Sequence, residues 1–327
     1  MSRQSAFHNP KILVFRGGAL GDFMLTLPAL LSLRLRWPKA YIELIGHENN
    51  TGLALTTGII DHLQSLDSAR MALYFQTECA LPPDEHKYIA SFDLVVSYLH
   101  DPDGVLRHHL KEAGAKNIAV VSPLVSKSHA ADHFFSGLKS ILGDEIKKCP
   151  PARLAWPAQL SQAARKRLRA DIGKKQIIII HPGSGSPAKN WPVEKFTRLA
   201  KKIRTETRFE PLIIGGEAEA SEITALRPLL PDFHIFDNLP LPDVASILSV
   251  ASGFVGNDSG LTHLAAALGI PVIALFGPTD PAVWGPRGDK ILIIRSRRPT
   301  TESLAKIGVE FVFQAISALK MGATRPL

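Results

Sequence analysis

The chain has 327 residues, more than a single hydrophobic core usually organises, so we expect two domains of about 150 residues each. Hydrophobic residues make up 45% and charged residues 21%, which excludes an intrinsically disordered chain. The net charge is +8, and much of the positive excess lies in residues 165–175. A solvated helix face explains this cluster better than a nucleic-acid partner, so we predict no nucleic-acid binding.

Cysteine usage and the start of the chain indicate the compartment. The two cysteines, Cys79 and Cys149, have neither metal-ligand spacing nor the number that a disulfide framework needs, which suits a reducing cytosol. Residues 1–10 are polar, and no run in the chain approaches the about 20 apolar residues that span a membrane. We therefore expect a cytoplasmic protein without a zinc site.

Strand-like and helix-like segments alternate along the first half of the chain. The first strand is expected at 11–15, followed by a glycine-rich turn and an apolar helix pattern at 23–35. Further strands are expected at 41–45, 94–98 and 118–122. The segments between them are long enough for crossover helices, which predicts a parallel sheet covered on both faces.

A proline-rich connector is expected at 143–160, and a second alternation of strands and helices follows it. Its first strand, 175–181, contains four consecutive isoleucines, as is typical of a strand buried on both faces. The other expected strands are 211–214, 233–236, 253–255, 271–276 and 291–294. The expected helices are one that begins near 192 and those at 218–230, 242–251, 261–268 and 303–320.

These elements predict an α/β protein of two Rossmann-like, doubly wound domains, residues 1–155 and 156–327, that face a central cleft. Open sheets of this kind bind ligands outside the carboxyl ends of their strands. The last helix either closes the second domain or packs back on the first, and the sequence leaves both arrangements open.

The strongest candidate site begins where the expected strand 253–255 ends. Asp258 or Ser259 can cap the next helix, and Gly260 allows a ligand to approach the backbone closely. Free N–H groups and the positive end of the helix dipole would then favour a diphosphate. An ordinary capped helix is the alternative interpretation.

A second glycine-rich turn follows the first strand. It contains Gly17, Gly18 and Gly21, but it lacks the G-x-G-x-x-G spacing of a dinucleotide site, and no acidic residue ends the second strand. A nicotinamide dehydrogenase is therefore disfavoured. Asp22 lies at the head of the next helix, where it either accepts a proton from a hydroxyl nucleophile or caps the helix.

Several blocks occur together in a characteristic order. They are Gly21-Asp22 with Thr26-Leu-Pro-Ala29, His181-Pro-Gly-Ser184 with Lys189-Asn-Trp191, Asp258-Ser-Gly-Leu-Thr-His263, and Phe276-Gly-Pro-Thr-Asp-Pro281. In this combination the chain, from about residue 11 to 288, resembles the ADP-heptose:lipopolysaccharide heptosyltransferases of glycosyltransferase family nine.

The resemblance implies a GT-B fold, with an acceptor-binding N-terminal domain and a C-terminal domain that binds an ADP-sugar, with ADP-heptose or the ADP derivative of a related sugar as the expected donor. It implies transfer to a lipid-linked lipopolysaccharide core, with inversion and without a metal or other cofactor, and with Asp22 as general base. Such an acceptor implies possible peripheral contact with the inner face of the inner membrane. The expected acceptor-side residues are Arg16, Gly17, Gly18 and Gly21.

Departure of a nucleoside diphosphate requires cationic and N–H stabilisation. Lys189 matches the family's phosphate-binding lysine, His263 either donates to the phosphates or packs against the Pro-Gly-Ser loop, and Glu217 is a candidate for the ribose hydroxyls. The other expected donor-site residues are Ser184, Ser186, Asp258, Ser259, Gly260 and Thr262.

Some segments depart from the family pattern or match another motif weakly. The turn at 17–19 lacks hydroxyl residues and the loop after Val96 differs from the common form, so the acceptor is less defined than the donor. Asp101-Pro-Asp103 reads D-x-D, but a turn explains it better than a metal site, and His108-His109 reads as an exposed pair. A sugar-nucleotide epimerase or hydrolase, and a non-catalytic sugar-nucleotide-binding protein, remain alternative functions.

Overall fold

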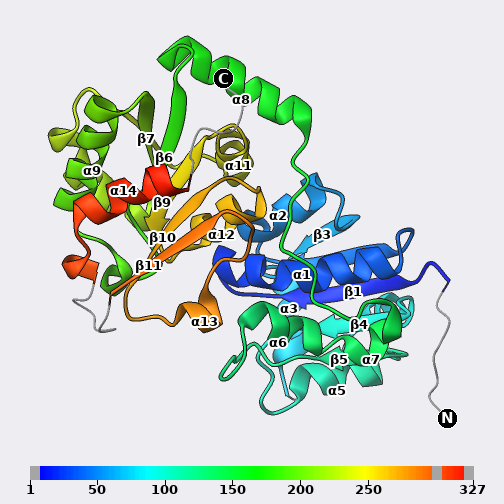
Figure 1. Ribbon diagram of the computed structural model, residues 1–327. Coiled ribbons are helices and arrows are strands. Elements are labelled where there is room, and N and C mark those ends of the chain that lie inside the picture. The colour runs from blue at the N-terminus through cyan, green and yellow to red at the C-terminus, as the bar shows by residue number, and fades with distance from the viewer. Residues whose placement is uncertain (1–7, 78, 297–303, 320–327) are drawn as a thin grey trace. The chain divides into compact units, whose positions relative to one another are not determined.

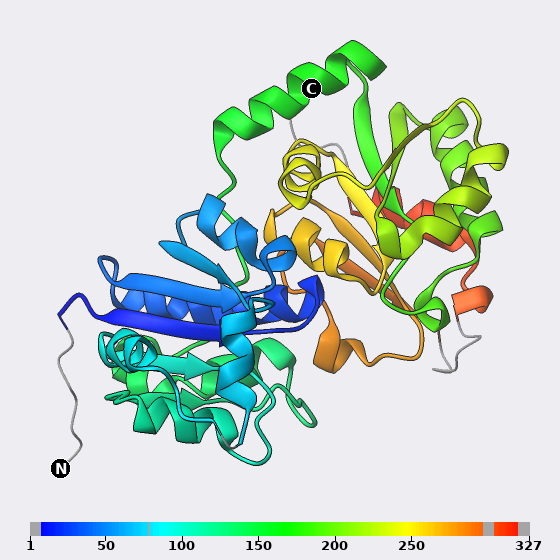
Figure 2. The same ribbon diagram turned by 180° about the vertical axis from the view of Figure 1, so that it is seen from behind.

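The computed structural model describes residues 8–77, 79–296 and 304–319. The chain divides into two compact units, Met1–Pro150 and Pro151–Leu327, each built on its own sheet. The division falls inside the connector expected at 143–160. Figures 1 and 2 show the elements of each unit from two opposite sides.

The first unit contains a five-stranded sheet in the order β3-β2-β1-β4-β5, and every strand pair in it is parallel. Its strands are β1 (Lys11–Arg16), β2 (Tyr41–Gly46), β3 (His62–Ser65), β4 (Leu94–Ser97) and β5 (Ile118–Val120). The structure adds β3 to the expected strands. Its sequence, His-Leu-Gln-Ser, has a single apolar residue, so pairing with β2 rather than hydrophobic pattern defines it.

Helices cover this sheet because alternate side chains of its strands point to opposite faces. Leu13 and Phe15 of β1, for example, share one core with Ile89 and Leu106. The helices are α1 (Leu20–Arg36), α2 (Glu48–Thr56), α3 (Ala69–Ala72), α4 (Pro83–Ala90), α5 (Val105–Glu112), α6 (Ala130–Ser136) and α7 (Lys139–Leu142), with 3-10 turns η1 (Leu73–Phe75) and η2 (Gly143–Glu145).

The second unit contains a six-stranded parallel sheet in the order β11-β10-β9-β6-β7-β8. Its strands are β6 (Gln176–His181), β7 (Phe209–Gly215), β8 (His234–Asp237), β9 (Gly253–Asn257), β10 (Val272–Phe276) and β11 (Ile291–Arg295). The four isoleucines of β6 have no exposed surface, as their continuous apolar run predicts.

The helices of this unit are α8 (Ala158–Ile172), α9 (Val193–Glu206), α10 (Ala220–Leu226), α11 (Leu241–Ser249), α12 (Gly260–Ala267), α13 (Pro281–Trp284) and α14 (Val309–Ala318), with 3-10 turns η3 (Pro187–Lys189), η4 (Glu217–Glu219), η5 (Arg227–Leu229) and η6 (Leu304–Lys306). The helix expected at 218–230 is interrupted, since Pro228 lacks the N–H that an α-helix needs there. The basic residues 165–169 lie on α8, whose first residue is already inside the expected connector.

The last helix closes the second unit. Figure 1 shows α14 in red beside α9, and α14 also contacts β10. Val309 and Val312 share a core with Phe196 and Ile273. The expected ends of this helix, residues 303 and 320, lie outside the described residues.

Two features follow from these sheets. The α/β class and the two doubly wound sheets are confirmed. In each sheet the strand order reverses at one point, between β1 and β4 in the first and between β6 and β9 in the second, and open α/β sheets bind ligands at the carboxyl ends of such strands. Among the residues that the structure describes, no helix has the length and apolar character to cross a membrane.

Candidate functional site

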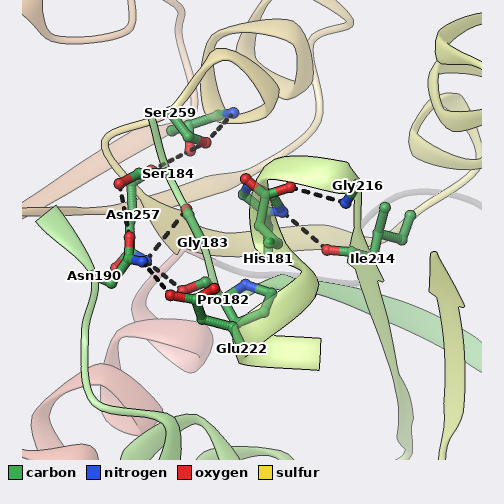
Figure 3. Close-up of polar contacts among 12 residues, drawn as sticks. His181, Pro182, Gly183, Ser184, Asn190, Ile214, Gly216, Glu222, Asn257 and Ser259 are labelled. Atoms are coloured by element: carbon green, nitrogen blue, oxygen red, sulfur yellow. Dashed lines mark hydrogen bonds and ion pairs between the residues drawn. The ribbon is translucent and has the colours of Figure 1, made fainter. Parts of the chain in front are cut away.

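The loop after β6 is tied to the carboxyl end of β9 by one buried amide. Asn257 Nδ2 donates to the carbonyl oxygens of Pro182, at 2.8 Å, and Gly183, at 3.3 Å (Figure 3). Its Oδ1 accepts from the Trp191 backbone N–H at 3.0 Å. Asn257 has no exposed surface. Both ends of the loop 182–191 are therefore held at the strand-order reversal of the second sheet.

Two expected donor-site serines shape the interior of this loop. The Ser184 hydroxyl lies 2.8 Å from the Ser186 carbonyl oxygen and 2.7 Å from Asn190 Oδ1, and it accepts from the Ser186 N–H at 3.2 Å. The Asn190 amide donates in turn to Glu222 at 2.6 Å (Figure 3). Ser184 is buried and serves the loop itself, whereas Ser186 is half-buried.

An ion pair brings together two residues that are 69 positions apart in the chain. Lys189 Nζ lies 3.3 Å from Asp258 Oδ2, and the Thr279 hydroxyl donates to the same oxygen at 2.7 Å. The side chain of Asp258 is 8% exposed and that of Lys189 is 24% exposed. A buried carboxylate thus positions a cation that retains access to solvent.

The start of α12 uses Ser259, rather than Asp258, as its cap. The Ser259 hydroxyl accepts from the Thr262 N–H at 3.4 Å, and the Thr262 hydroxyl donates to the Asn257 carbonyl oxygen. Gly260 is the first helical residue and is half-buried. Thr262 has no exposed surface, so its hydroxyl is committed inside the protein. The first N–H groups of a helix have no acceptor within the helix.

His263 lies on α12 and is 7% exposed. It has a polar or ring interaction within the protein. Its contact with phosphates therefore stays a prediction, as does its packing against the Pro-Gly-Ser loop.

A buried histidine–glutamate pair lies behind the loop, and sequence reasoning missed it. The His181 ring donates from Nδ1 to the Ile214 carbonyl oxygen at 2.9 Å, and its Nε2 lies 3.8 Å from Glu219 Oε1 (Figure 3). Glu219 also accepts from the Gly216 N–H at 2.8 Å. Burial lowers the pKa of His181, and the nearby Glu219 carboxylate opposes that shift.

Position 183 has to be glycine because of this pair. A Cβ there would collide with the side chain of Glu219. The expected ribose-binding residue, Glu217, is exposed on the same 3-10 turn. A short turn with two glutamates gives no sequence signal for which one points inward, and the buried one forms the pair with His181.

The glycine turn after β1 carries the candidate base Asp22. Gly18 has a φ of +90°, where a side chain is strained, and a Cβ there would lie 2.8 Å from Asp22 Oδ2. Asp22 Oδ2 accepts from the Ala19 N–H at 3.1 Å, so the carboxylate does hold the helix start. The Asp22 side chain nevertheless remains 42% exposed, which leaves it accessible to a ligand.

Arg16 stabilises this turn through contacts with Asp22. Its Nη2 donates to the Asp22 carbonyl oxygen at 2.9 Å and lies 3.9 Å from Asp22 Oδ1, and the guanidinium lies 4.9 Å from the centre of the Phe134 ring. Arg16 is 3% exposed, and burial lowers its pKa while Asp22 opposes that shift. The positive charge of Arg16 therefore interacts with Asp22 rather than with solvent.

The D-x-D sequence forms a turn before α5, as expected. Asp101 accepts from the N–H groups of Leu106, at 3.2 Å, and Arg107, at 3.0 Å. No group of three His, Cys, Asp or Glu side chains able to hold a metal occurs among the described residues. The expectation of an exposed histidine pair is wrong for His109, which is 6% exposed and bonds the Gln76 carbonyl oxygen through Nε2.

The Asn257 amide generates a stability prediction. Asn257→Asp replaces the donor with a buried carboxylate facing two carbonyl oxygens, so we expect unfolding of the second unit to be easier by about 2–4 kcal/mol. Urea denaturation monitored by circular dichroism measures it. Asn238→Asp, the same change at an exposed position, is the control and should cost less than about 0.5 kcal/mol. Equal stability of both variants would contradict the assigned role.

Comparison with known proteins gives a family match to residues 139–309, more than half of the chain, for glycosyltransferase family 9 (heptosyltransferase). The chain is 24% identical over 311 residues to lipopolysaccharide heptosyltransferase 2 of Salmonella typhimurium, covering 87% of this chain and 88% of that one. It is 31% identical over 161 residues to lipooligosaccharide heptosyltransferase 2 of Haemophilus influenzae, covering 46% of each chain.

Solved structures share the fold. A glycosyl transferase family 9 protein from Veillonella parvula superimposes with a TM-score of 0.77 at 20% identity, covering 96% of this chain and 98% of that one. The Escherichia coli ADP-heptose lps heptosyltransferase II gives 0.75 at 19% identity, covering 94% and 98%. With the family match spanning more than half its length and a GT-B fold composed of the two units, the chain belongs to glycosyltransferase family 9, and it is a glycosyltransferase.

Proposed function

We propose that this glycosyltransferase moves a heptose, or a related sugar, from an ADP-sugar to a lipopolysaccharide core or related saccharide acceptor, with inversion at the anomeric carbon and without a metal. The observation that carries the proposal is the Lys189–Asp258 pair beside the amino end of α12, at the strand-order reversal of the second sheet. Lipopolysaccharide heptosyltransferases among the relatives support the substrate class.

The donor diphosphate would bind to Lys189 and the free N–H groups that begin α12. Two positive features, the lysine ammonium and the helix dipole, favour an anion there. The same groups would stabilise the charge that appears on ADP as the glycosidic bond breaks. The expected donor-side contacts of Ser186, Glu217, Gly260 and His263 belong to this proposal.

Asp22 would act as the general base. In a single displacement, the acceptor hydroxyl oxygen bonds to the anomeric carbon, the bond to the diphosphate oxygen breaks, and the hydroxyl proton passes to a carboxylate. Attack opposite the departing group inverts the configuration. Asp22 suits this role because its side chain is 42% exposed at the end of β1, while Ala19 and Arg16 hold it in place. The glycines of the turn would form the acceptor side.

The proposed reaction needs no metal, because a lysine and helix N–H groups would take the place of a divalent cation at the diphosphate. The acceptor is lipid-linked in this proposal, so peripheral contact with the inner face of the inner membrane is part of it.

An assay with ADP-heptose and vesicles that carry a lipopolysaccharide-core acceptor tests the whole proposal. We expect release of ADP, transfer with inverted configuration, rates that EDTA does not change, and sedimentation of the protein with the vesicles. ADP-heptose consumed without acceptor would indicate a hydrolase or epimerase instead, and donor binding without turnover would indicate a binding protein.

Removing the base should abolish the chemical step. Asp22→Asn keeps an oxygen that can accept from the Ala19 N–H, so the turn should fold, and kcat should fall by about 10²–10⁴-fold, since general base catalysis contributes that much. ADP affinity should not change. Asp103→Asn, in an exposed turn of the same unit, is the control and should leave kcat unchanged. Turnover of Asp22→Asn at the wild-type rate would refute the mechanism.

Removing the lysine should weaken the donor complex. We expect the ADP Kd of Lys189→Ala, measured by calorimetry, to rise about 10-fold or more, because charge-assisted hydrogen bonds are the strong ones. Lys174→Ala, which removes an exposed lysine of the same unit, should not change the Kd. Equal affinities of Lys189→Ala and the wild type would count against the phosphate assignment.

A further inference from the structure

A histidine–aspartate pair lies at the carboxyl edge of the first sheet, outside the machinery described above. His47 directly follows β2, and Asp67 follows β3 by two residues. Because β2 and β3 run parallel, both residues come to the same edge. His47 Nδ1 and Asp67 Oδ2 are 2.9 Å apart.

The pair fixes the orientation and tautomer of the ring. A carboxylate only accepts hydrogen bonds, so His47 donates from Nδ1, and the Nε2 of the neutral ring then carries an open lone pair. Within the described part of the chain, Nε2 has no hydrogen-bond partner. The His47 side chain is 36% exposed, so a ligand can reach it.

The open nitrogen faces the glycine turn that carries Asp22. A Cβ built on Gly17 would lie 3.9 Å from His47 Nε2, and 3.2 and 3.1 Å from methyl carbons of Leu66 and Leu99. A side chain at Gly17 would therefore approach both the imidazole and the methyl groups of the two leucines.

A second contact holds the two segments together. The Asn50 side chain, in the first turn of α2, donates to the Gly18 carbonyl oxygen at 3.1 Å. On the other side of the turn, a Cβ on Gly18 would lie 2.8 Å from Asp22 Oδ2. Two adjacent glycines thus separate an imidazole nitrogen that can accept a hydrogen bond from the proposed catalytic carboxylate.

We propose that His47, positioned by Asp67, binds the acceptor saccharide, with Nε2 accepting a hydrogen bond from a sugar hydroxyl next to the one that Asp22 deprotonates. This inference rests on the proposed function. The hydroxyl bound by His47 does not react, so the contact exists before and during the chemical step. An interaction of equal strength in both states acts on KM rather than on kcat.

His47→Asn tests the roles of the two ring nitrogens separately. The shorter amide can still donate to Asp67 from about the position of Nδ1, but it has no group at the position of Nε2. We expect the acceptor KM to rise about 3- to 10-fold, the range for one lost hydrogen bond, while kcat and the ADP-sugar KM stay within about 2-fold. His62→Asn is the matched control, since His62 is an exposed histidine at the opposite end of β3, and it should change nothing.

The positioning role of Asp67 has its own readout. Asp67→Ala frees the ring, so the acceptor KM should rise by less than in His47→Asn. The double variant should be no worse than His47→Asn alone, because Asp67 acts only through the ring. Additive effects, an unchanged acceptor KM in His47→Asn, or an equal rise in both KM values would each overturn the inference.

A binding measurement distinguishes failure of this inference from failure of the proposed function. The His47 ring signals, assigned by their absence in His47→Asn, are followed by NMR during titration with a lipopolysaccharide-core oligosaccharide. A saturable shift of these signals supports the contact even if the wild type transfers no heptose. No shift at saturating oligosaccharide overturns it.

Discussion

Every strand of both sheets runs in the same direction as its neighbours, and this constraint positions the main polar groups of both candidate sites. Parallel strands bring their carboxyl ends to one edge, so residues far apart in sequence meet there without any local signal. His47 and Asp67 meet in this way in the first unit. In the second, Lys189 meets Asp258 only because β6 lies next to β9.

Several polar groups at these edges are paired with other groups of the protein. Lys189 forms an ion pair with Asp258, and Arg16 contacts the carbonyl oxygen and carboxylate of Asp22. Asn257 forms hydrogen bonds with the loop that begins at Pro182. A buried charge or amide without a partner costs stability, so such pairing is a condition for folding. It also means that the groups are already oriented when a substrate binds, which reduces the entropy that binding has to overcome.

The local sequence pattern predicts some structural features correctly and others wrongly. The isoleucine run of β6 predicts a strand buried on both faces, and Ser259 was one of two residues recognised as candidate caps of α12. By contrast, the polar strand β3 was missed, and His109 was predicted to be exposed although it bonds the Gln76 carbonyl oxygen. Both failures involve partners more than 15 residues away, which periodicity along one segment does not register.

The sequence by itself determined the α/β class, the succession of strands and helices, and the blocks that mark the family, because each depends on neighbouring residues or on short motifs. Only the tertiary structure decided that Glu219 rather than Glu217 points inward, that α14 closes its own unit, and that His47 comes to lie beside Gly17. The physical reason is the same in all three cases. Burial and hydrogen bonding depend on which strands become neighbours, and that choice is made by the packing of whole sheets and helices rather than by any one segment.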